Sequence, residues 1–389
     1  MADQLKKVLI LHNRYRNSGG EERYVQSQYE LLTERGHQVE LYNLDSGDLT
    51  GTLGKLRAAR SLVSGGMKPA AIGELVNTGG YDVAHFHNIH PLFGPRAVAA
   101  AKSAGATTVM HLHNYRIFCA VGVAYRDGKL CEDCHGRNTL PGLRNNCRRS
   151  RPESFSYATG LSLHQQRLLK AVDSFITPSE AAADQLANFG LPRNRITVVP
   201  HFVEPTTDNL KQSNSGYAIY CGRLSEEKGV ETAVAAAALA KVPLKVVGDG
   251  PQRHELETLN ARLAGQAVFT GRVERAQLNE LVSNASALLL PSRCNETGGY
   301  AALEAMAVGV PVLASSLGAL PEIVGNGDQC IDPQLVEPWA EKLKELLNDR
   351  DLAQRLGAAG KERIAQLFTP DRHYKLLLET YAQSGLTQA

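Results

Sequence analysis

Short runs rich in valine, isoleucine and leucine alternate with longer segments of helical period along almost the whole chain. Strands joined by helical connections pair in parallel, and the helices then cover both faces of the sheet. The first half of the chain contains the runs KKVLILH, HQVELYN, YDVAHFHN, TTVMHLHN, SFITPS and ITVVPHF. This half is therefore predicted to be an α/β domain built on a parallel sheet.

The alternation stops once and then starts again. The segment from Glu204 to Gly216 is polar and has no apolar period, which indicates a linker. A second series of strand-like runs follows it: YAIYCGR, LKVVGDG, AVFTGR, ALLLPS and VPVLASS. A chain of 389 residues is too long for one ordinary core, so we expect two Rossmann-like domains, residues 1–204 and 217–369, with 205–216 between them. Ligands bind at the carboxyl ends of such strands, so the two sheets should face each other across a cleft.

Two segments depart from this pattern. Residues 114–153 show neither strand nor helix period, and a loop of that length inside a domain is usually functional or held by something other than a core. The last segment, PDRHYKLLLETYAQ, is amphipathic. We expect a helix over 370–389 that packs back on the first domain.

The charges nearly cancel, with 42 Lys and Arg against 40 Asp and Glu, and a net charge of +2 gives no support for a nucleic-acid partner. No apolar run approaches the roughly 20 residues that a membrane span needs. The stretch MADQLKKVLILHN lacks the small-residue cleavage site of a secretory signal, so a cytoplasmic location is expected. Peripheral contact with the inner membrane face and the oligomeric state both stay open.

A glycine pair, Gly19–Gly20, lies between the first predicted strand and the first predicted helix. Backbone N–H groups at a helix start favour anions, so this loop is a candidate phosphate site, although a plain turn is the alternative. The chain has no G-x-G-x-x-G here, which removes most of the support for a dinucleotide dehydrogenase.

The second domain opens with YCGRLSEEKGVETAV, in which Arg223 ends a strand and Lys228 begins a helix. A planar guanidinium and an ammonium can converge on a diphosphate, and two solvated surface cations are the alternative. The turn GDGP, which includes Gly248, suits close approach of a ligand to the backbone.

The stretch CNETGGYAALEAM follows the predicted buried strand ALLLPS. Its helix should start at Gly298–Gly299, which places Glu296 in the preceding loop and Glu304 inside the helix. Free N–H groups at the helix start suit phosphate, and carboxylates accept hydrogen bonds from hydroxyl groups. A nucleotide sugar offers both kinds of group.

These elements together resemble the family 4 retaining glycosyltransferases of the GT-B fold. Glu296 and Glu304 have the E-x7-E spacing, GRLSEEKG is similar to the family's Arg/Lys element, and SGGEERYV to its first glycine loop. The resemblance extends over nearly the whole chain in the expected order. It implies transfer of a hexosyl group from a nucleotide-diphosphate sugar, UDP- or GDP-linked, to a hydroxyl acceptor in polysaccharide, glycolipid or other glycoconjugate synthesis.

The resemblance also assigns roles to residues. Arg223 and Lys228 would hold the donor diphosphate, Glu304 the ribose and Glu296 the sugar. The predicted catalytic residues are His113, Glu296, Arg223 and Lys228. The predicted donor-binding residues are Gly19, Gly20, Arg223, Lys228, Gly248, Glu296, Thr297, Gly298, Gly299, Tyr300 and Glu304.

The family needs no divalent metal, so the cations and helix amides would stabilise the leaving nucleoside diphosphate. The departing phosphate oxygen would then take the acceptor proton. A sugar-nucleotide 2-epimerase of similar fold is one alternative, and a donor that turns over without an acceptor would identify it. A non-catalytic, zinc-supported binding module is the other.

His113 matches the family's histidine beside the reacting sugar carbon. His111 should point to the same face of the strand, and His85 and His87 repeat this arrangement in another predicted strand. For these three histidines a structural role is the favoured interpretation.

Four cysteines, Cys119, Cys131, Cys134 and Cys147, lie within the irregular segment 114–153 with the spacing C-x11-C-x2-C-x12-C. Four thiolates with one C-x2-C pair suit a structural zinc ion that would hold a loop without a core. Free thiols or an iron–sulfur cluster are the alternatives. Arginines of the same segment, among them Arg144 and Arg148, are candidates for contact with an anionic acceptor such as a lipid diphosphate, and solvated surface charge is the alternative.

Overall fold

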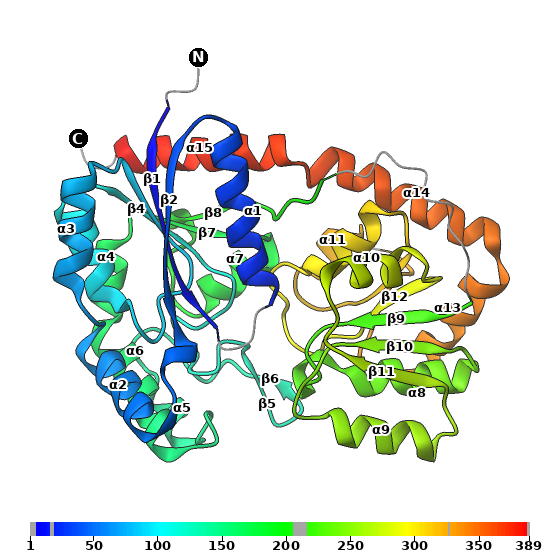
Figure 1. Cartoon of the computed structure of the whole chain (residues 1–389). Coiled ribbons are helices and arrows are strands. Elements are labelled where there is room, and N and C mark those ends of the chain that lie inside the picture. Colours follow the sequence, from blue (N-terminus) through cyan, green and yellow to red (C-terminus); the bar gives the residue numbers. More distant parts are fainter. Residues whose placement is uncertain (1–4, 16–18, 205–215, 326, 387–389) are drawn as a thin grey trace. The chain divides into compact units, whose positions relative to one another are not determined.

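Figure 1 shows the computed structural model of the chain, which describes residues 5–15, 19–204, 216–325 and 327–386. Residues 205–215 of the predicted linker lie outside the described residues. Internal contacts divide the chain into two units, each with its own sheet. The first unit comprises Met1–Ala124, Glu132–Val199 and His373–Ala389, and the second comprises Tyr125–Cys131 and Pro200–Arg372.

The first unit contains a parallel sheet of six strands in the order β2-β1-β3-β4-β7-β8. The prediction of a parallel α/β sheet is therefore confirmed for this half of the chain. The strands are β1 (Lys7–Arg14), β2 (Gln38–Asp45), β3 (Val83–Phe86), β4 (Thr107–His111), β7 (Ser174–Thr177) and β8 (Ile196–Val198).

Helices connect these strands, and the last helix of the chain belongs mostly to this unit. They are α1 (Gly20–Glu34), α2 (Gly51–Ser64), α3 (Pro69–Gly79), α4 (Gly94–Ser103), α5 (Leu140–Arg144), α6 (Arg151–Ala171), α7 (Glu180–Asn188) and α15 (Pro370–Leu386). Local signals mark several starts: at α7, for example, the Ser179 hydroxyl accepts a hydrogen bond from the backbone N–H of Ala182 at 3.1 Å.

The two faces of the first sheet differ in chemistry. On one face Leu11, Phe86 and Met110 join a large apolar cluster under α3, α4 and α6. On the other face the alternate positions of β3 and β4 carry buried histidines, His85 and His111 among them. Because successive side chains of a strand point to opposite faces, this polar layer and the apolar core share the same strands.

The second unit repeats the architecture with a different strand order, β11-β10-β9-β12-β13-β14, again all parallel. The order reverses at β9, which lies between β10 and β12, so the carboxyl ends of β9 and β12 flank the expected ligand position. The strands are β9 (Ala218–Cys221), β10 (Leu244–Val247), β11 (Ala267–Gly271), β12 (Ala287–Leu290), β13 (Val312–Ser315) and β14 (Cys330–Ile331).

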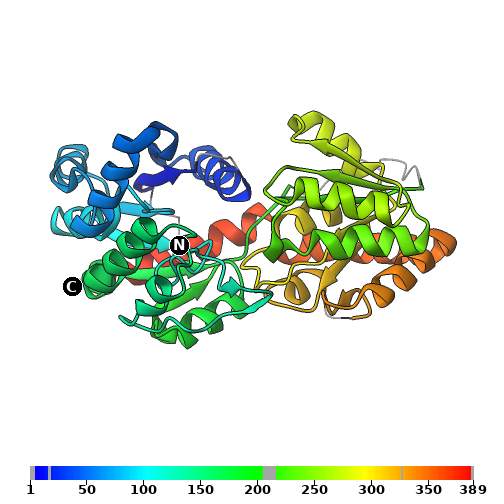
Figure 2. The same ribbon diagram turned by 90° about the horizontal axis from the view of Figure 1, so that it is seen from below.

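Apolar clusters lie on both faces of this sheet, because Ile219 and Leu288 belong to one cluster and Tyr220 and Leu289 to the other. Figure 2 shows the helices on the two sides of the strands. They are α8 (Val230–Ala240), α9 (Arg253–Arg262), α10 (Arg275–Ser283), α11 (Tyr300–Ala307), α12 (Leu320–Val324), α13 (Val336–Asn348) and α14 (Arg350–Leu367).

The segment 114–153 contains more regular structure than the sequence predicts. It forms a two-stranded antiparallel hairpin, β5 (Tyr125–Arg126) with β6 (Lys129–Leu130), and the short helix α5. These elements are too short to show a period in the sequence. No helix in the described part of the chain is both long enough and apolar enough to cross a membrane.

Candidate active site

In the second unit, Lys228 and Glu296 form an ion pair beside the carboxyl ends of β9 and β12. Lys228 ends a 3-10 turn, Glu226–Lys228, and Glu296 lies in the loop after β12. Nζ of Lys228 lies 2.6 Å from Oε1 of Glu296, and the Ser292 hydroxyl donates a hydrogen bond to the same oxygen at 2.6 Å. The pair therefore occupies the point where the strand order reverses.

The electrostatics of this pair keep both groups charged. Burial acts to raise the pKa of Glu296, but the charge of Lys228, the hydrogen bonds from Lys228 and Ser292 and the charge of Arg223 together lower it below its usual value. Burial acts to lower the pKa of Lys228, and the charge of Glu296 outweighs it and raises this pKa. Arg223 and Lys228 therefore both act on Glu296, so the fold brings these three predicted residues to one site.

Glu304 lies within α11, and a residue that the sequence does not mark is its partner. Nη2 of Arg275, at the start of α10, donates a hydrogen bond to Oε1 of Glu304 at 2.9 Å. Burial raises the pKa of Glu304 to about 7, although Arg275 acts to lower it. Arg275 is 29 positions from Glu304 and belongs to no recognisable motif, so only the folded chain brings them together.

Two of the predicted glycines meet strict geometric demands. Gly299 caps α11 with φ of 42°, and a Cβ atom there would lie 2.7 Å from Cδ2 of Leu320. Gly248 has φ of 130°, and a Cβ atom there would lie 1.9 Å from the carbonyl oxygen of Gly222. Gly248 therefore needs a residue without a side chain, whereas a side chain at position 299 would require Leu320 to move. The other predicted members, Thr297, Gly298 and Tyr300, lie in the loop and at the first position of α11.

The loop before α1 differs from a free phosphate site. The N–H of Gly19 donates to Oε2 of Glu22 at 2.9 Å, and the N–H of Tyr15 donates to Oε1 of the same carboxylate at 2.8 Å. Two acidic residues, Glu21 and Glu22, also lie in the first turn of α1, which begins at Gly20. The N–H of Gly19 thus already has an anionic partner from its own helix.

A second polar group that the sequence analysis missed lies at the end of β1. His12 is 1% exposed, with its Nδ1 3.7 Å from Oε1 of Glu21 and its Nε2 3.9 Å from Oε1 of Glu22. Within the described part of the chain, neither ring nitrogen makes a hydrogen bond, and Oε1 of Glu21 also lacks one. The Tyr15 hydroxyl donates to the other Glu21 oxygen at 3.0 Å. The repeated His-Asn pair at three strand ends, ILHN, FHN and LHN, is the sequence signal for this position.

Glu21 should reduce stability above neutral pH. Burial raises the pKa of Glu21 to about 7, against a usual value of 4.5. Between these two pH values the folded protein holds a proton that the unfolded chain has lost, so stability falls as pH rises and the full cost is present above pH 7. Glu21→Gln is therefore expected to raise the free energy of unfolding by about 1–3 kcal/mol at pH 8 and by little at pH 4.5. Denaturant unfolding at the two pH values measures this, with Glu34→Gln on the same helix as the exposed control.

The predicted catalytic His113 lies just beyond β4 and contacts His87, which lies just beyond β3. Nε2 of His113 lies 2.9 Å from Nδ1 of His87, and the two rings stack with centroids 5.2 Å apart at 16°. Tyr24 of α1 packs edge-on against both rings, at 5.1 Å from His113 and 5.9 Å from His87. The contact with His87 thus restrains the ring of His113.

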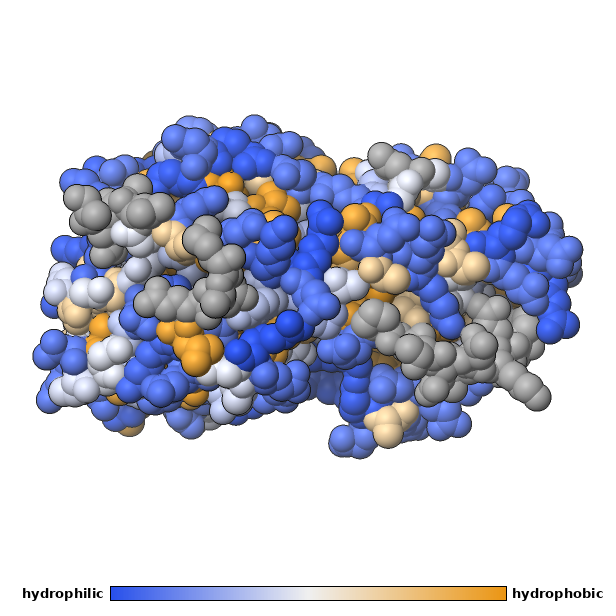
Figure 3. All heavy atoms as spheres, turned by 90° about the horizontal axis from the view of Figure 1, so that it is seen from above, coloured by the Kyte–Doolittle hydropathy of each residue, from blue (hydrophilic) through white to orange (hydrophobic). Residues whose placement is uncertain are grey.

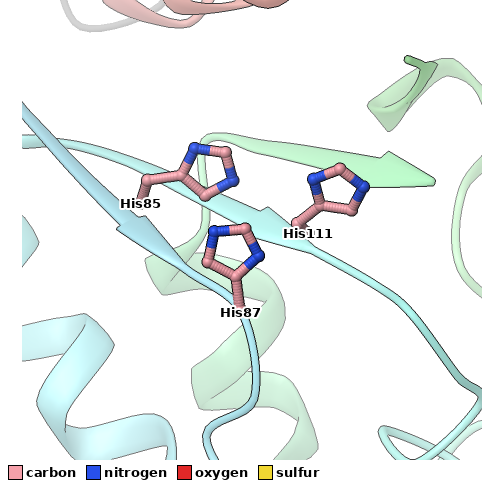
Figure 4. Close-up of side chains that lie close together, drawn as sticks. All are labelled: His85, His87 and His111. Carbon is pink, nitrogen blue, oxygen red and sulfur yellow. The ribbon is translucent and has the colours of Figure 1, made fainter. Parts of the chain in front are cut away.

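The remaining histidines of this face form a buried layer (Figure 4). His85, His87 and His111 are 0%, 3% and 1% exposed, and they extend from β3 and β4 toward α1 and α15. Nδ1 of His85 lies 2.7 Å from the Tyr381 hydroxyl of α15, and Nδ1 of His111 lies 3.3 Å from the Tyr24 hydroxyl of α1. This layer fixes both helices to the sheet, which agrees with the structural role expected for these three histidines.

The proximity of these three rings raises the question of a metal ion, because each offers a ligand atom within 4.8 Å of the others. Their planes are nearly parallel: His85 and His87 meet at 5°, His85 and His111 at 16°, and His87 and His111 at 21°. A metal ion lies close to the plane of each imidazole that binds it, so stacked rings cannot share one ion without turning. The geometry favours a hydrogen-bonded layer.

The four cysteines of the predicted zinc site do not form such a group. Among the described residues, the groups of three or more metal-binding side chains with ligand atoms within 4.8 Å contain histidines and no cysteine. Hydrogen bonds hold part of the segment instead: Gln165 donates to the carbonyl of Gly136 at 2.7 Å, and Thr139 to the carbonyl of Ala158 at 2.6 Å. The structural zinc site at these four cysteines therefore stays a prediction.

Two family profiles match adjoining parts of the chain. The family described as Glycosyltransferase Family 4 matches residues 18–207, and Glycosyl transferases group 1 matches residues 206–363. Glycogen synthase of Mycobacterium tuberculosis is 31% identical over 215 residues, which are 52% of this chain and 52% of that protein. The 2-deoxystreptamine glucosyltransferase of Streptomyces kanamyceticus is 33% identical over 224 residues, 51% of this chain and 58% of that enzyme. The chain thus spans little more than half the length of these relatives.

Solved structures agree in fold over nearly the full chain. Sucrose-phosphate synthase from Thermosynechococcus elongatus has a TM-score of 0.70 at 20% identity, covering 97% of this chain and 99% of that one. HepE of Anabaena in complex with UDP-glucose has a TM-score of 0.64 at 18% identity, covering 96% and 99%. Both are glycosyltransferase folds of the GT-B type, so the predicted fold class is confirmed. With the two profiles together covering residues 18–363, the chain belongs to the family 4, group 1 glycosyltransferases.

Proposed function

We propose that this glycosyltransferase moves a hexosyl group from a UDP- or GDP-linked sugar to a hydroxyl acceptor, with retention of anomeric configuration and without a catalytic divalent metal. The main support is the cluster at the ends of β9 and β12. Arg223 and Lys228 act there on one buried carboxylate, Glu296, with Lys228 at 2.6 Å. The relatives named above include enzymes of sugar transfer, and the HepE structure holds UDP-glucose.

The chemistry requires the bond between C1 of the sugar and the diphosphate oxygen to break while a bond from C1 to the acceptor oxygen forms. The leaving group gains negative charge, which Arg223 and Lys228 stabilise in place of a metal ion. An ammonium has three N–H donors, so Lys228 can keep its bond to Glu296 and still donate to a phosphate oxygen. The acceptor hydroxyl gives its proton to the departing phosphate oxygen on the same face, and no side-chain base is needed.

The carboxylates recognise hydroxyl groups in this proposal. Glu296 accepts a hydrogen bond from the transferred sugar, and Glu304 accepts bonds from the ribose of the nucleotide. The backbone N–H groups from Thr297 to Tyr300, at the start of α11, add donors beside them. We assign His113 of the first unit to the reacting sugar carbon on the family resemblance, and His87 contacts its ring at 2.9 Å.

In this proposal the Gly19–Gly20 loop has a different role from the predicted one. Because the N–H of Gly19 is bonded to Glu22, a donor phosphate would reach this N–H only by displacing that carboxylate. Oε1 of Glu21 is a buried atom without a hydrogen-bond partner among the described residues, and it can accept a bond from a hydroxyl of the donor or acceptor. We therefore assign hydroxyl recognition to this loop in preference to phosphate binding.

The decisive experiment is a screen of nucleotides and nucleotide sugars by thermal shift in the presence of EDTA, followed by mass spectrometry of the products. UDP or GDP should raise the melting temperature without magnesium, and the matching sugar should be transferred to an added acceptor. Glu304→Ala should remove the shift. The absence of any shift with every nucleotide would contradict the proposal, and turnover of the donor without an acceptor would indicate an epimerase.

The pairing of Arg275 with Glu304 predicts how nucleotide affinity depends on pH. Glu304, whose pKa is about 7, must be ionised to accept ribose hydroxyl bonds, so affinity should rise as pH increases from 6 to 8. Arg275→Gln removes a cation that lowers this pKa, so its affinity should rise only at higher pH. Calorimetric titration with UDP or GDP at pH 6, 7 and 8 measures this, and Glu304→Gln should remove this contribution to the pH dependence.

The structural zinc prediction has a separate test. Elemental analysis of the purified full chain should give about one zinc ion per chain if the four cysteines bind it. Chelation should then lower the melting temperature, because the segment 114–153 would lose its cross-link. Clearly substoichiometric zinc would contradict a four-thiolate site.

A further inference from the structure

The basic charge of the chain is concentrated in two segments of the first unit. Residues 51–68 and 137–170 contain eleven Lys and Arg and one Glu, a net charge of +10. The whole chain carries +2, so all its other residues together carry −8. The net charge of the whole chain is small although its positive charge is strongly concentrated in these two segments. They correspond largely to α2, α5 and α6.

The same helices expose an unusual share of apolar side chains. Twelve large hydrophobic side chains of the described residues are exposed, and six of them lie on these helices: Leu53, Leu56, Val63, Leu140, Phe155 and Leu163. Leu53 is 75% exposed and Leu56 is 62% exposed. The face seen from above in Figure 3 is by comparison mostly hydrophilic, with apolar side chains in small separate groups.

The three helices form one continuous surface. Gly160 of α6 lies against α2 so closely that a Cβ atom would be 2.6 Å from the carbonyl oxygen of Leu62. A ring nitrogen of His164 lies 2.8 Å from the carbonyl oxygen of Val63, and α5 also packs against α6. Figure 1 shows α2, α5 and α6 together at the lower left. We call this surface the α2–α5–α6 face.

The basic side chains of this face are available for a partner. Lys55, Arg57 and Arg60 are exposed on α2 and make no ion pair with any described residue, and α2 contains no acidic residue. Arg144 and Arg151 are likewise exposed at α5 and α6. Water solvates the exposed cations, but the leucines between them leave apolar area in contact with water, which is typical of an interaction surface.

We propose that the α2–α5–α6 face docks reversibly on an anionic lipid bilayer. Lys and Arg near such a surface are attracted by its negative potential, and leucine and phenylalanine side chains gain by insertion at the boundary between headgroups and acyl chains. A nucleic acid would also attract the cations, but its phosphates would leave the leucines in water. This inference does not depend on the proposed transfer reaction.

The test is co-sedimentation of the full chain with vesicles of 30% phosphatidylserine in phosphatidylcholine, and with vesicles of phosphatidylcholine alone. We expect binding to the anionic vesicles that falls by about tenfold or more without phosphatidylserine or at 0.5 M NaCl. The double variants Arg57→Gln/Arg60→Gln and Leu53→Ser/Leu56→Ser should each weaken binding to anionic vesicles by about tenfold. Arg350→Gln/Arg355→Gln, on the exposed surface of α14, is the matched control and should bind like the parent chain.

Three outcomes would overturn the proposal. One is no binding to the anionic vesicles. Another is an equal loss of vesicle binding in the α14 control and in the α2 variants, which would indicate non-specific electrostatic attraction. The third is binding of single-stranded DNA that Arg57→Gln/Arg60→Gln removes and Leu53→Ser/Leu56→Ser does not, without vesicle binding; this would assign the face to nucleic acid. Thermal melting of each variant verifies that the fold is intact.

Discussion

Replacing Lys228 by methionine is expected to lower kcat for sugar transfer by about 10²–10³-fold. The methionine keeps the length and apolar stem of the side chain but removes the charge that lies 2.6 Å from Glu296 and that we assign to the leaving diphosphate. Removal of one preorganised charge at a developing anion has costs of this order. The assay uses the nucleotide sugar identified by the thermal-shift screen, with kcat and KM measured separately.

Loss of stability has to be separated from loss of catalysis, because Lys228→Met leaves Glu296 buried without its cation. The double variant Lys228→Met/Glu296→Met replaces both members of the pair, so it should regain most of the lost melting temperature and none of the activity. Lys344→Met, at an exposed position of α13, is the control for removal of a lysine. Near-parental kcat in a folded Lys228→Met protein would exclude the assigned role.

The sequence is sufficient to predict most of the fold, because each main strand is a short apolar run followed by a turn. ALLLPS, for example, becomes β12 and the start of the loop that carries Glu296. Elements of two residues, such as β5 and β14, could not be predicted, since two residues define no period. Their formation depends on neighbours that only the folded chain supplies.

The site could be predicted where a residue belongs to a local motif and not where it depends on long-range packing. Glu296 and Lys228 belong to motifs, and the fold brings them together as an ion pair. Arg275 meets Glu304 across 29 positions, and no motif marks it. Gly318 was missed for the same reason: it has φ of 60°, and a Cβ atom there would lie 2.5 Å from the backbone nitrogen of Glu296.

At the Gly19–Gly20 loop, the residues that follow the glycine pair change the ligand that the motif predicts. A glycine pair at a helix start predicts a phosphate site, but the next two residues are Glu21 and Glu22. Their carboxylates supply the negative charge that such a site would take from a ligand, and one of them accepts the N–H of Gly19 at 2.9 Å. The acidic pair therefore changes the expected ligand group from phosphate to hydroxyl.

Truncation of His113 to alanine is expected to lower kcat by about 10²-fold or more, and His87 should act through it. The 2.9 Å contact between Nδ1 of His87 and Nε2 of His113 fixes which nitrogen of His113 carries a proton. His87→Phe preserves a stacked ring but removes the hydrogen bond. We expect it to lower kcat by about tenfold, with little change in KM and a displaced pH profile, because the hydrogen bond from His87 no longer selects the nitrogen of His113 that carries the proton.

His85→Phe separates this positioning role from a structural one. His85 stacks on His87 at 4.6 Å and is equally buried, but its ring bonds to Tyr381 of α15 and not to His113. It should lower the melting temperature, because the Tyr381 hydroxyl loses its partner, and leave the pH profile of kcat unchanged. His87→Gln retains a side chain that can hydrogen-bond to His113 and should recover part of the activity lost in His87→Phe. Equal pH profiles in His87→Phe, His85→Phe and the parent enzyme would show that His87 only supports the fold, since loss of packing lowers stability without changing the hydrogen bonding of His113.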